Sequence, residues 1–439
     1  MRLQEALSVQ PAAFPGGRSL VRTGTVIVGS YIAIALVNTF ALRLYTELAP
    51  AKTFGEFNLV QTALMLGIQL FVAPFTNTQL RYHTQAQASG AAGGFTREGL
   101  RWSLCGAGVL GAIVFPTCLL CGRLGGPKLG IGVAAPAVAW VYATTLRNVL
   151  MGRLQAEQRR LLYGSLAVFE AVALVLATVV ALHFRATTSS FLIGQLVAPA
   201  ALVVAGTWVH PWVDLSAKPS TAQRAEFRRR ALEYGLPFTP LAIGAWLANL
   251  ADRFVLGLFT GAAAVGQYVA PLAIASRGMT LLNGALNDYF RPMLFDAENR
   301  DQRERANGVF ASWIAASATI GCAAVGVIAL GGGLVARILL AAAYRGGAVE
   351  IMVWIAAGYG IYGLTQIIET RLLSFGKSAQ LLPTMTTGAI ANVALSAALI
   401  PRHGTLGAAQ ASCLSFVVQG LVTATFWARA QRRRSVQSN

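Results

Sequence analysis

The sequence is poor in charge, in acidic residues especially, and in cysteine. Only 12% of its 439 residues are charged and 55% are apolar, whereas average soluble domains carry about 25% charge. These proportions exclude a soluble globular protein. The five cysteines all lie within apolar stretches, and we interpret them as small core residues and not as disulfides or metal ligands.

The sequence also lacks the motifs on which many enzymes depend. It has no glycine-rich phosphate loop followed by Lys and Ser or Thr, so we expect no ATP-driven chemistry on this chain. Its four histidines are divided between opposite sides of the predicted spans, which argues against a Ser-His-Asp set. We therefore expect no catalytic residues, no metal site and no cofactor, and a protein that is not an enzyme.

Long apolar runs are what the sequence has in abundance. About 20 apolar residues are needed for a helix to cross the hydrocarbon core of a bilayer. Twelve such runs predict an all-α polytopic membrane protein: Thr23–Leu42, Phe57–Pro74, Trp102–Cys121, Ile131–Met151, Leu161–His183, Phe191–Val209, Gly235–Phe259, Ala262–Tyr289, Val309–Leu330, Val349–Glu369, Leu381–Ile400 and Leu406–Trp427. The segment Leu334–Ala343 is too short to span, and we expect it to lie at the membrane interface.

The basic residues provide an independent test of this topology. Twelve spans place both termini on one side, and 25 of the 35 Lys and Arg residues fall on that side, against 8 on the other. Cytoplasmic loops are the ones enriched in Lys and Arg, so both termini are predicted to be cytoplasmic. The net charge of +18 is then mostly a topology signal and not a sign of nucleic-acid binding. Two arginines, Arg253 and Arg277, remain inside the spans.

The longest polar connection between spans divides the helices six and six. We predict an N-terminal bundle at 1–214, a basic cytoplasmic linker at 215–234 and a C-terminal bundle at 235–439. An even number of helices in each half gives both halves the same orientation, as in parallel repeats. Within the linker, Thr221–Tyr234 is interpreted as an amphipathic helix on anionic membrane lipids or, alternatively, as a solvated connection.

A short motif recurs at the start of each half. In the first half Arg43 is followed by Phe54-Gly55-Glu56-Phe57, and in the second half Arg253 is followed by Val265-Gly266-Gln267-Tyr268. The spacing from Arg to Gly is 12 residues in one half and 13 in the other. The match supports a repeat related by a two-fold axis along the membrane normal.

These repeated motifs resemble the polysaccharide-export branch of the multidrug/oligosaccharidyl-lipid/polysaccharide exporter superfamily. Near the C-terminus, Gly376-Lys377, Asn392 and the segment from Pro401 through Gly404 to Gly407-Ala408-Ala409 are also similar to that family. The resemblance implies a MATE-like fold of two six-helix bundles around a central cavity, with transport by alternating access. It further implies a location in the bacterial inner membrane.

The resemblance also implies a substrate class and partners. The expected substrate is a polyprenyl-diphosphate-linked oligosaccharide for O-antigen, capsule or exopolysaccharide, handed on to the polymerase and chain-length proteins of the pathway. A multidrug or cation antiporter of the same superfamily is an alternative, although such proteins usually carry acidic residues in the first helix, where this chain has none over Thr23–Leu42. Two alternative hypotheses belong to other functional classes: a membrane glycan polymerase or ligase, and an assembly partner that does not transport.

Ionisable and polar groups inside the spans are the candidate functional residues, because their insertion is costly. Arg277 is central to a polar stripe that includes Thr280 and Asn287 at helical spacing, suited to line a cavity and bind a diphosphate through the planar guanidinium. Asn249, Arg253 and Asn392 are further cavity candidates, with a hydrogen bond between helices as the alternative role for Asn392.

Three other intramembrane residues are candidates for coupling to Na+, H+ or the membrane potential. Glu170 lies about 13 Å inside its helix, and Arg147 of the preceding helix could pair with it, so an ion pair and a coupling role stay open. Asp252 lies beside Arg253, where a local ion pair is the alternative to coupling.

Overall fold

The computed structural model describes residues 17–123, 130–210, 219–377 and 380–437, and within them the fold is helical with no β-strand. Arg2, Lys128 and Lys218, which contribute to the predicted charge asymmetry, lie outside the described residues. The elements in chain order are α1 (Gly17–Leu48), α2 (Ala51–Phe71), α3 (Ala73–Ala88), α4 (Ala92–Arg123), α5 (Ile131–Ala156), α6 (Arg160–Phe184), α7 (Thr188–Val209), α8 (Thr221–Arg230), a π-helix (Ala231–Gly235), α9 (Phe238–Thr260), α10 (Ala262–Asn299), α11 (Arg303–Leu339), a 3-10 helix (Ala342–Tyr344), α12 (Ala348–Ser374) and α13 (Leu381–Gln437).

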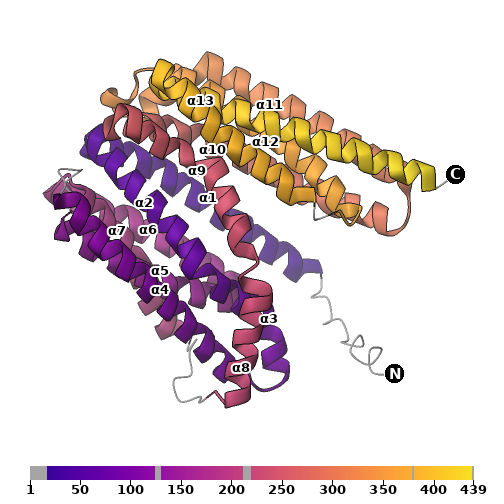
Figure 1. The fold of residues 1–439 in the computed structure, drawn as a ribbon, viewed down its shortest axis with the longest axis horizontal. Helices are drawn as coiled ribbons and strands as arrows, with labels where there is room; N and C mark the ends of the chain where they lie inside the picture. The colour runs from indigo at the N-terminus through magenta and orange to yellow at the C-terminus, as the bar shows by residue number, and fades with distance from the viewer. Residues whose placement is uncertain (1–16, 124–129, 211–218, 378–379, 438–439) are drawn as a thin grey trace.

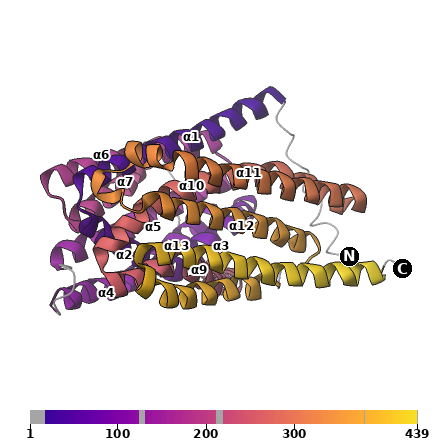
Figure 2. The same ribbon diagram turned by 90° about the horizontal axis from the view of Figure 1, so that it is seen from above.

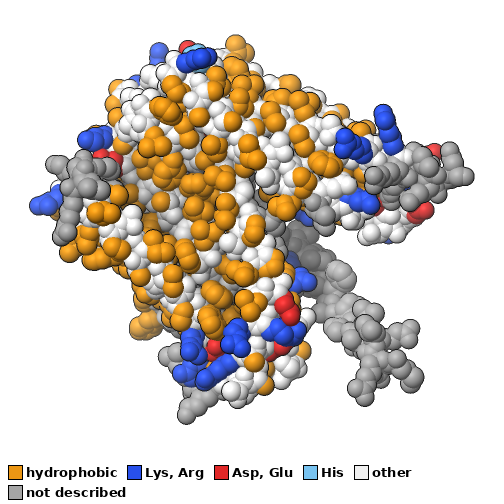
Figure 3. Space-filling view, in the orientation of Figure 1, with side chains coloured by type: hydrophobic (Ala, Val, Ile, Leu, Met, Phe, Trp, Pro, Cys, Tyr) orange, Lys and Arg blue, Asp and Glu red, His pale blue; other side chains and the backbone are white. Residues whose placement is uncertain are grey.

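Many of these helices have the length and composition of membrane spans. Seven qualify among the residues described, namely α4, α6, α7, α9, α11, α12 and α13, and α2 with α3 forms an eighth that is bent by 52°. Large apolar side chains such as Trp208 and Leu330 are 88% and 93% exposed, as expected for surfaces that face lipid. Figure 3 shows apolar side chains across much of the face, with Lys and Arg gathered toward its ends. The chain is a multi-pass membrane protein.

α13 consists of two helices that reverse direction at Gly404. This glycine has φ 58° and ψ −129°, a conformation that other residues rarely adopt. Asn392 donates from Nδ2 to Oγ of Ser415 over 3.3 Å, although a straight helix would hold these residues about 35 Å apart. With α2 and α3 counted as one and α13 as two, twelve of the described helices are long enough to cross a bilayer. The predicted all-α fold is confirmed.

The helices form two lobes arranged as a V (Figure 1). The N lobe contains α1–α7 and the C lobe contains α9–α13; we call the end where the lobes meet the closed end. The lobes diverge toward the opposite end, the open end, where both ends of the described chain lie. A perpendicular view shows the helices of both lobes running along the same general direction (Figure 2).

Two glycines bring the lobes together at the closed end. A Cβ atom on Gly55 of α2 would overlap the carbonyl oxygen of Ala262, and a Cβ atom on Gly266 of α10 would overlap the carbonyl oxygen of Ala51. In each lobe the glycine is preceded, four residues earlier, by a residue whose carbonyl packs against the glycine of the other lobe. The repeated motifs of the sequence therefore meet one another in the fold, in the reciprocal manner of a two-fold axis.

The turn between α1 and α2 adds hydrogen bonds across the same junction. The hydroxyl of Tyr344 in the C lobe donates to the carbonyl of Ala49 over 2.8 Å, and this tyrosine is 1% exposed. The backbone N–H of Ala341 donates to Oγ1 of Thr46 over 3.1 Å. The connection between α11 and α12 is therefore fixed against the N lobe.

Two arginines share the carbonyl groups at the end of α11. Arg43 of the N lobe donates from Nη1 to the carbonyls of Arg337 and Leu340 over 3.2 and 2.5 Å. Arg345 of the C lobe donates to the same two carbonyls, each over 3.0 Å. Arg43 also pairs with Glu47, one turn along α1.

The segment Leu334–Ala343, predicted as a separate interfacial piece, is for most of its length the end of α11. α11 continues without a break through Gly331–Gly333 to Leu339. Gly332 is buried against α12, where a Cβ atom would lie 3.1 Å from Cγ1 of Val349. Close packing against α12 favours the helix here, and glycine permits this approach, although it has a low helix propensity.

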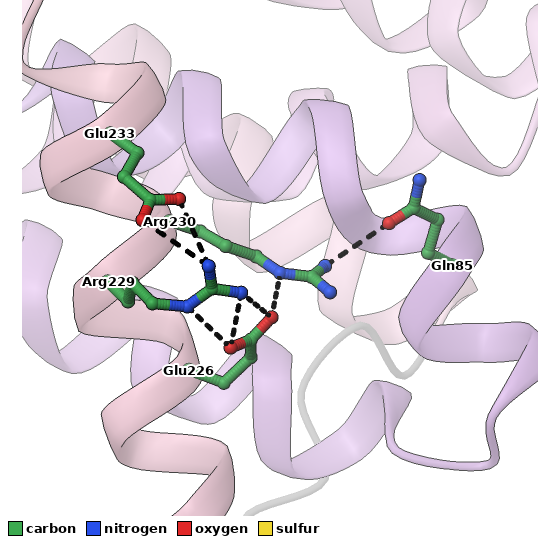
Figure 4. Close-up of polar contacts among 5 residues, drawn as sticks. All are labelled: Gln85, Glu226, Arg229, Arg230 and Glu233. Carbon is green, nitrogen blue, oxygen red and sulfur yellow. Dashed lines mark hydrogen bonds and ion pairs between the residues drawn. The ribbon is translucent and has the colours of Figure 1, made fainter.

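α8 and the π-helix lie at the open end of the N lobe (Figure 1). Phe227 is 0% exposed and its ring lies 5.0 Å from that of Phe95, so the main apolar side chain of α8 packs on protein and not on lipid. Figure 4 shows Glu226 accepting hydrogen bonds from Arg229 and Arg230, over 2.9 and 2.5 Å at the shortest. These arginines hold the pKa of Glu226 below its usual value.

Candidate functional site

Arg277 lies in a cavity of about 430 Å3 between α1 and α10, at the inner side of the V. Its Nη1 donates to the carbonyl of Asn38 in α1 over 3.0 Å. Thr39, Ser276 and Thr280 add hydroxyl groups to the cavity wall. Among the described residues no carboxylate lies within 4 Å of the Arg277 guanidinium, so most of its five N–H donors remain for an anion.

The polar stripe predicted on α10 is partly brought to this cavity. Arg277 and Thr280 both line it, together with the aromatic ring of Tyr359 from α12. Asn287 lies about two turns further toward the open end, where its side chain is half-buried and outside the cavity wall. The cavity therefore contains only part of the predicted stripe.

Arg253 does not share the cavity of Arg277. It extends from α9 to α2, where its Nη1 donates to Oγ1 of Thr62 over 3.2 Å. Trp246, two turns earlier in α9, donates from its indole N–H to the carbonyl of the same threonine over 3.0 Å. The Nε of Arg253 is buried with no hydrogen-bond partner in the part of the chain described. Asn249 bonds back to the carbonyl of Ala245 within its own helix.

A second cavity of about 430 Å3 lies beside this contact, between α2, α5 and α9. Its wall is mostly apolar and aromatic, with Trp140 and Trp246 facing it, and Gln69 and Thr144 provide polar groups. Neither Arg253 nor Asn249 belongs to its wall.

Glu170 and Arg147 form an ion pair inside the N lobe. The Nη2 of Arg147 lies 2.8 Å from Oε2 of Glu170, and its Nε donates to both carboxylate oxygens over 3.0 Å. This bidentate geometry is the strongest that a guanidinium and a carboxylate adopt. The pair lines a third cavity of about 280 Å3 that also contains Asn38 and Gln195. The predicted pair is therefore present, and it faces a cavity.

Asp252 is buried inside the C lobe, at 2% exposed. Its Oδ2 accepts hydrogen bonds from the hydroxyls of Tyr268 and Ser412 over 2.5 and 3.2 Å, and its Oδ1 accepts from the backbone N–H of Arg253 over 2.8 Å. The side chain is turned toward α10 and α13, whereas the guanidinium of Arg253 is turned toward α2. A side-chain ion pair between these neighbours is not formed.

Asn392 packs inside the α13 hairpin and does not line the cavities described above. Its side chain is 1% exposed and donates to Ser415 across the hairpin. Of the two roles open for it from the sequence, an interhelical hydrogen bond is the one that the structure shows.

Several residues of these cavities were not singled out from the sequence. Asn38 and Thr39 lie within the repeated segment before Arg43, and Tyr359, Gln195 and Thr144 are single polar residues in apolar helices. An isolated polar residue in a long apolar run carries no signal of which neighbour it faces. Asn38 is the residue that could have been predicted to line a cavity, because it is a polar residue inside an apolar run, close to Arg43 of the repeated motif.

Comparison with known proteins now adds to these observations. A family model described as "Polysaccharide biosynthesis protein" matches residues 104–348. The chain belongs to this family. A sequence search of curated proteins found no match.

Solved structures show the same fold. A structure described as "Lipid II flippase MurJ, inward closed conformation" matches with a TM-score of 0.70 at 12% identity, over 92% of this chain and 86% of that one. An inward-facing multidrug resistance MATE family transporter of the MOP superfamily matches with a TM-score of 0.70 at 14% identity, over 91% and 96% of the two chains. A MOP superfamily transporter from Pyrococcus furiosus matches at 0.64 and 14%, over 95% and 96%. The polysaccharide biosynthesis family and the MATE-like fold expected from the sequence motifs are confirmed.

Proposed function

We propose that this chain is a flippase that moves a polyprenyl-diphosphate-linked oligosaccharide across the bacterial inner membrane by alternating access. The product would serve O-antigen, capsule or exopolysaccharide synthesis. The observation that carries the proposal is Arg277, a cation without a carboxylate partner among the described residues, in a polar cavity between the two lobes. Family membership and the likeness in fold to a lipid II flippase support it.

The cavity solves the main physical difficulty of such transport. Sugar hydroxyls and a diphosphate cannot cross about 30 Å of hydrocarbon unaided, because each unpaired polar group costs several kcal/mol. Guanidinium binds phosphate oxygens through paired N–H donors and keeps its proton at any physiological pH. Arg277 with the nearby hydroxyls would replace the water that the head group gives up.

α1 offers a way to keep the lipid tail outside the protein. Asn38 and Leu42 line the cavity of Arg277, whereas Leu36 and Phe40 on another face of the same helix are 55% and 66% exposed. The head group would occupy the cavity behind α1 while the prenyl chain stays in lipid along the exposed face. The polymerase and chain-length proteins of the pathway would receive the product on the other side.

The charge asymmetry of the loops supports a cytoplasmic open end. The side predicted to carry 25 of the basic residues is the side on which α1 begins and α13 ends, and these two helix ends lie at the open end of the V. The V is therefore the state that accepts substrate from the cytoplasm. Arg224 and Arg228 of α8 are exposed and would contact anionic membrane lipids there.

Coupling to H+, Na+ or the membrane potential would supply the energy. Asp252 is a buried carboxylate bound by two hydroxyls in the C lobe, and the Glu170–Arg147 pair is its counterpart as a candidate in the N lobe. Protonation or Na+ binding at Asp252 would change its contacts to α10 and α13, both of which belong to the C lobe.

A complementation assay tests the proposal. Arg277→Ala should abolish O-antigen or capsule production in a strain without its own flippase while its membrane level stays unchanged, and the matched variant Arg300→Ala, at the exposed end of α10, should stay active. Wild-type protein in liposomes should speed translocation of a prenyl-diphosphate sugar. Full activity of Arg277→Ala, or transport of organic cations in place of the lipid, would overturn the proposal, the latter in favour of an antiporter. Synthesis of new glycosidic bonds by the purified protein would indicate a polymerase or ligase.

A further inference from the structure

A polar vestibule lies at the open end of the N lobe, apart from the cavity of Arg277. It has a volume of about 500 Å3 and lies between α1, α5 and α6. The polar residues of its wall are Ser30, Arg147, Gln155, Gln158, Arg160 and Tyr163. Two guanidinium groups, two amides, a phenol and a serine hydroxyl therefore line one cavity, and no acidic residue is among its lining residues. Arg147 is paired with Glu170, so Arg160 is the guanidinium available to an anion.

The acidic residue of the loop between α5 and α6, Glu157, does not belong to the wall of the vestibule. Glu157 accepts a hydrogen bond from Nε of Arg153 over 2.6 Å and forms an ion pair with Arg159, whose Nε lies 3.1 Å from Oε2. The Nε2 atoms of His210 and His83 lie 3.0 and 3.7 Å from its two oxygens. Its side chain is 11% exposed, so it is held inside this cluster of arginine and histidine side chains.

Residues shortly before and after Glu157 line the vestibule. Gln158 has φ 54°, a left-handed conformation that is uncommon outside glycine, and Arg160 donates its backbone N–H to the carbonyl of Gln158 over 2.8 Å. This sharp turn brings Gln155, Gln158 and Arg160 to one cavity while Glu157 points elsewhere. No carboxylate in the described part of the chain lies within 4 Å of the Arg160 guanidinium.

The vestibule is continuous with the inner cavities. It shares Ile34, Arg147 and Ala167 with the cavity of the Glu170–Arg147 pair, and that cavity shares Ile34 and Asn38 with the cavity of Arg277. Arg160, Arg147 and Arg277 thus mark three successive positions along α1, from the open end inward.

We propose that the vestibule is a second anion site, at which the diphosphate of a lipid-linked substrate is first bound by Arg160 before it passes Arg147 and reaches Arg277. This inference rests on the proposed function and extends it. The two amides and the phenol of Tyr163 supply neutral donors for further phosphate oxygens and for the first sugar. Binding first at Arg160 and then at Arg277 pairs the anion with a guanidinium at the beginning and at the end of its way out of water, whereas Arg147 between them is paired with Glu170.

Calorimetric titration of the purified full-length protein with geranylgeranyl diphosphate tests the vestibule, with geranylgeraniol as the uncharged control ligand. The wild type should bind diphosphate at two sites. Arg277→Gln should leave one site, and Arg160→Gln in that background should weaken the remaining site about tenfold or more, because a charge-assisted hydrogen bond is lost. Arg300→Gln, which removes an exposed charge at the open end of the C lobe, should bind like the wild type. Arg160→Lys keeps the charge without the planar fork and should bind with intermediate affinity.

The outcomes separate the two proposals. If the double variant binds like Arg277→Gln alone, the vestibule is not an anion site and this inference is overturned, while the proposed function stands. If the wild type binds geranylgeranyl diphosphate no better than geranylgeraniol, the proposed function itself fails. In liposomes, Arg160→Gln should raise the KM for a prenyl-diphosphate sugar and leave kcat unchanged; the reverse pattern would contradict a loading role.

Discussion

Gly55 and Gly266 face each other across the junction of the two lobes. A Cβ atom on Gly55 would lie 2.8 Å from the backbone N of Gly266, and a Cβ atom on Gly266 would lie 3.1 Å from the backbone N of Gly55. Both distances are shorter than van der Waals contact, so the two helices approach as closely as backbones can. The closure of the V therefore depends on the absence of a side chain at two equivalent positions.

Gly55→Ala should shift the protein away from the closed junction. Overpacking of this kind costs about 1–3 kcal/mol, and α2 and α10 can relieve it by separating. Thr46, which is 3% exposed at the junction, provides the readout. In a background without native cysteines, Thr46→Cys should react with a maleimide several-fold faster when Gly55→Ala is also present.

Gly284→Ala is the matched control for this prediction. Gly284 also lies within α10, but no atom would lie within 4 Å of an added Cβ. The substitution should leave the labelling rate unchanged and stabilise the helix slightly, by up to about 1 kcal/mol. Equal labelling rates in the Gly55→Ala and Gly284→Ala variants would contradict the importance of the glycine contact.

Locking the closed junction should stop transport. The backbone N of Ala341 and Oγ1 of Thr46 are 3.1 Å apart, so cysteines at these two positions lie within reach of a disulfide after small adjustments. The oxidised Thr46→Cys/Ala341→Cys protein should lose flipping activity and regain it with reductant. Each single-cysteine variant should stay active under oxidation; activity of the cross-linked protein would mean that the lobes need not part here.

Arg277→Lys should be much less active than the wild type although the charge is kept. Lysine cannot reproduce paired donors toward one phosphate, and the loss of one or two charge-assisted hydrogen bonds, each about 1.5–3 kcal/mol, corresponds to at least tenfold. The measurement is the rate of prenyl-diphosphate sugar translocation in liposomes. Wild-type rates for Arg277→Lys would show that only the net charge of the cavity matters.

Asp252→Asn should uncouple transport from its ion gradient and leave the fold intact. The amide keeps an oxygen for the hydroxyls of Tyr268 and Ser412, while the charge that could bind a cation is removed. Translocation in liposomes should no longer respond to an imposed pH or Na+ gradient. Tyr268→Phe retains the carboxylate and should retain the response. If Asp252→Asn still responds, the same assay on Glu170→Gln tests the other candidate.

Glu157→Gln should destabilise the protein in a manner that depends on pH. Burial alone would raise the pKa of Glu157, but the hydrogen bond and charge of Arg153, with the charges of His210 and His83, together lower it. The carboxylate therefore contributes stability above its ordinary pKa of about 4.5, and this contribution is lost as the pH falls through the lower folded-state value.

At pH 7 we expect the substitution to cost about 1–3 kcal/mol, as for other hydrogen bonds to charged groups. At a pH near 4 and below, the difference from the wild type should shrink. The measurement is thermal unfolding of both proteins in detergent over this range. A difference in Tm that does not change with pH would show that the carboxylate charge is not what stabilises the loop.

Much of the architecture follows from the sequence because it depends on properties that add up along the chain. Apolar runs and the distribution of arginines define the spans, and the break at Gly404 separates the last two as expected. The repeat around Gly55 and Gly266 was visible as well, although its physical reason, a backbone contact between the repeats, could be seen only in three dimensions.

The functional cavities were harder to foresee because they depend on which helices face each other. Arg253 and Arg277 were equivalent as intramembrane arginines, yet one bonds to Thr62 of α2 and the other lines the cavity with Asn38. Asn392 was indistinguishable from a cavity residue until the hairpin placed it against Ser415. Local spacing determines the face of a helix, whereas the neighbour of that face is decided by the packing of the whole bundle.

Arg43 and Arg345 share two carbonyls at the end of α11, which lowers the free-energy cost of releasing Arg43 when the junction opens. When the lobes part, Arg43 leaves, but Arg345 stays with the carbonyls of Arg337 and Leu340 because it belongs to the same lobe. The end of α11 therefore keeps a donor for both carbonyls, and Arg43 keeps Glu47 as its partner. Separation of the lobes breaks the hydrogen bonds from Tyr344 to Ala49 and from Ala341 to Thr46, but it leaves these two carbonyls paired. The barrier to opening thus contains the former bonds and not the latter.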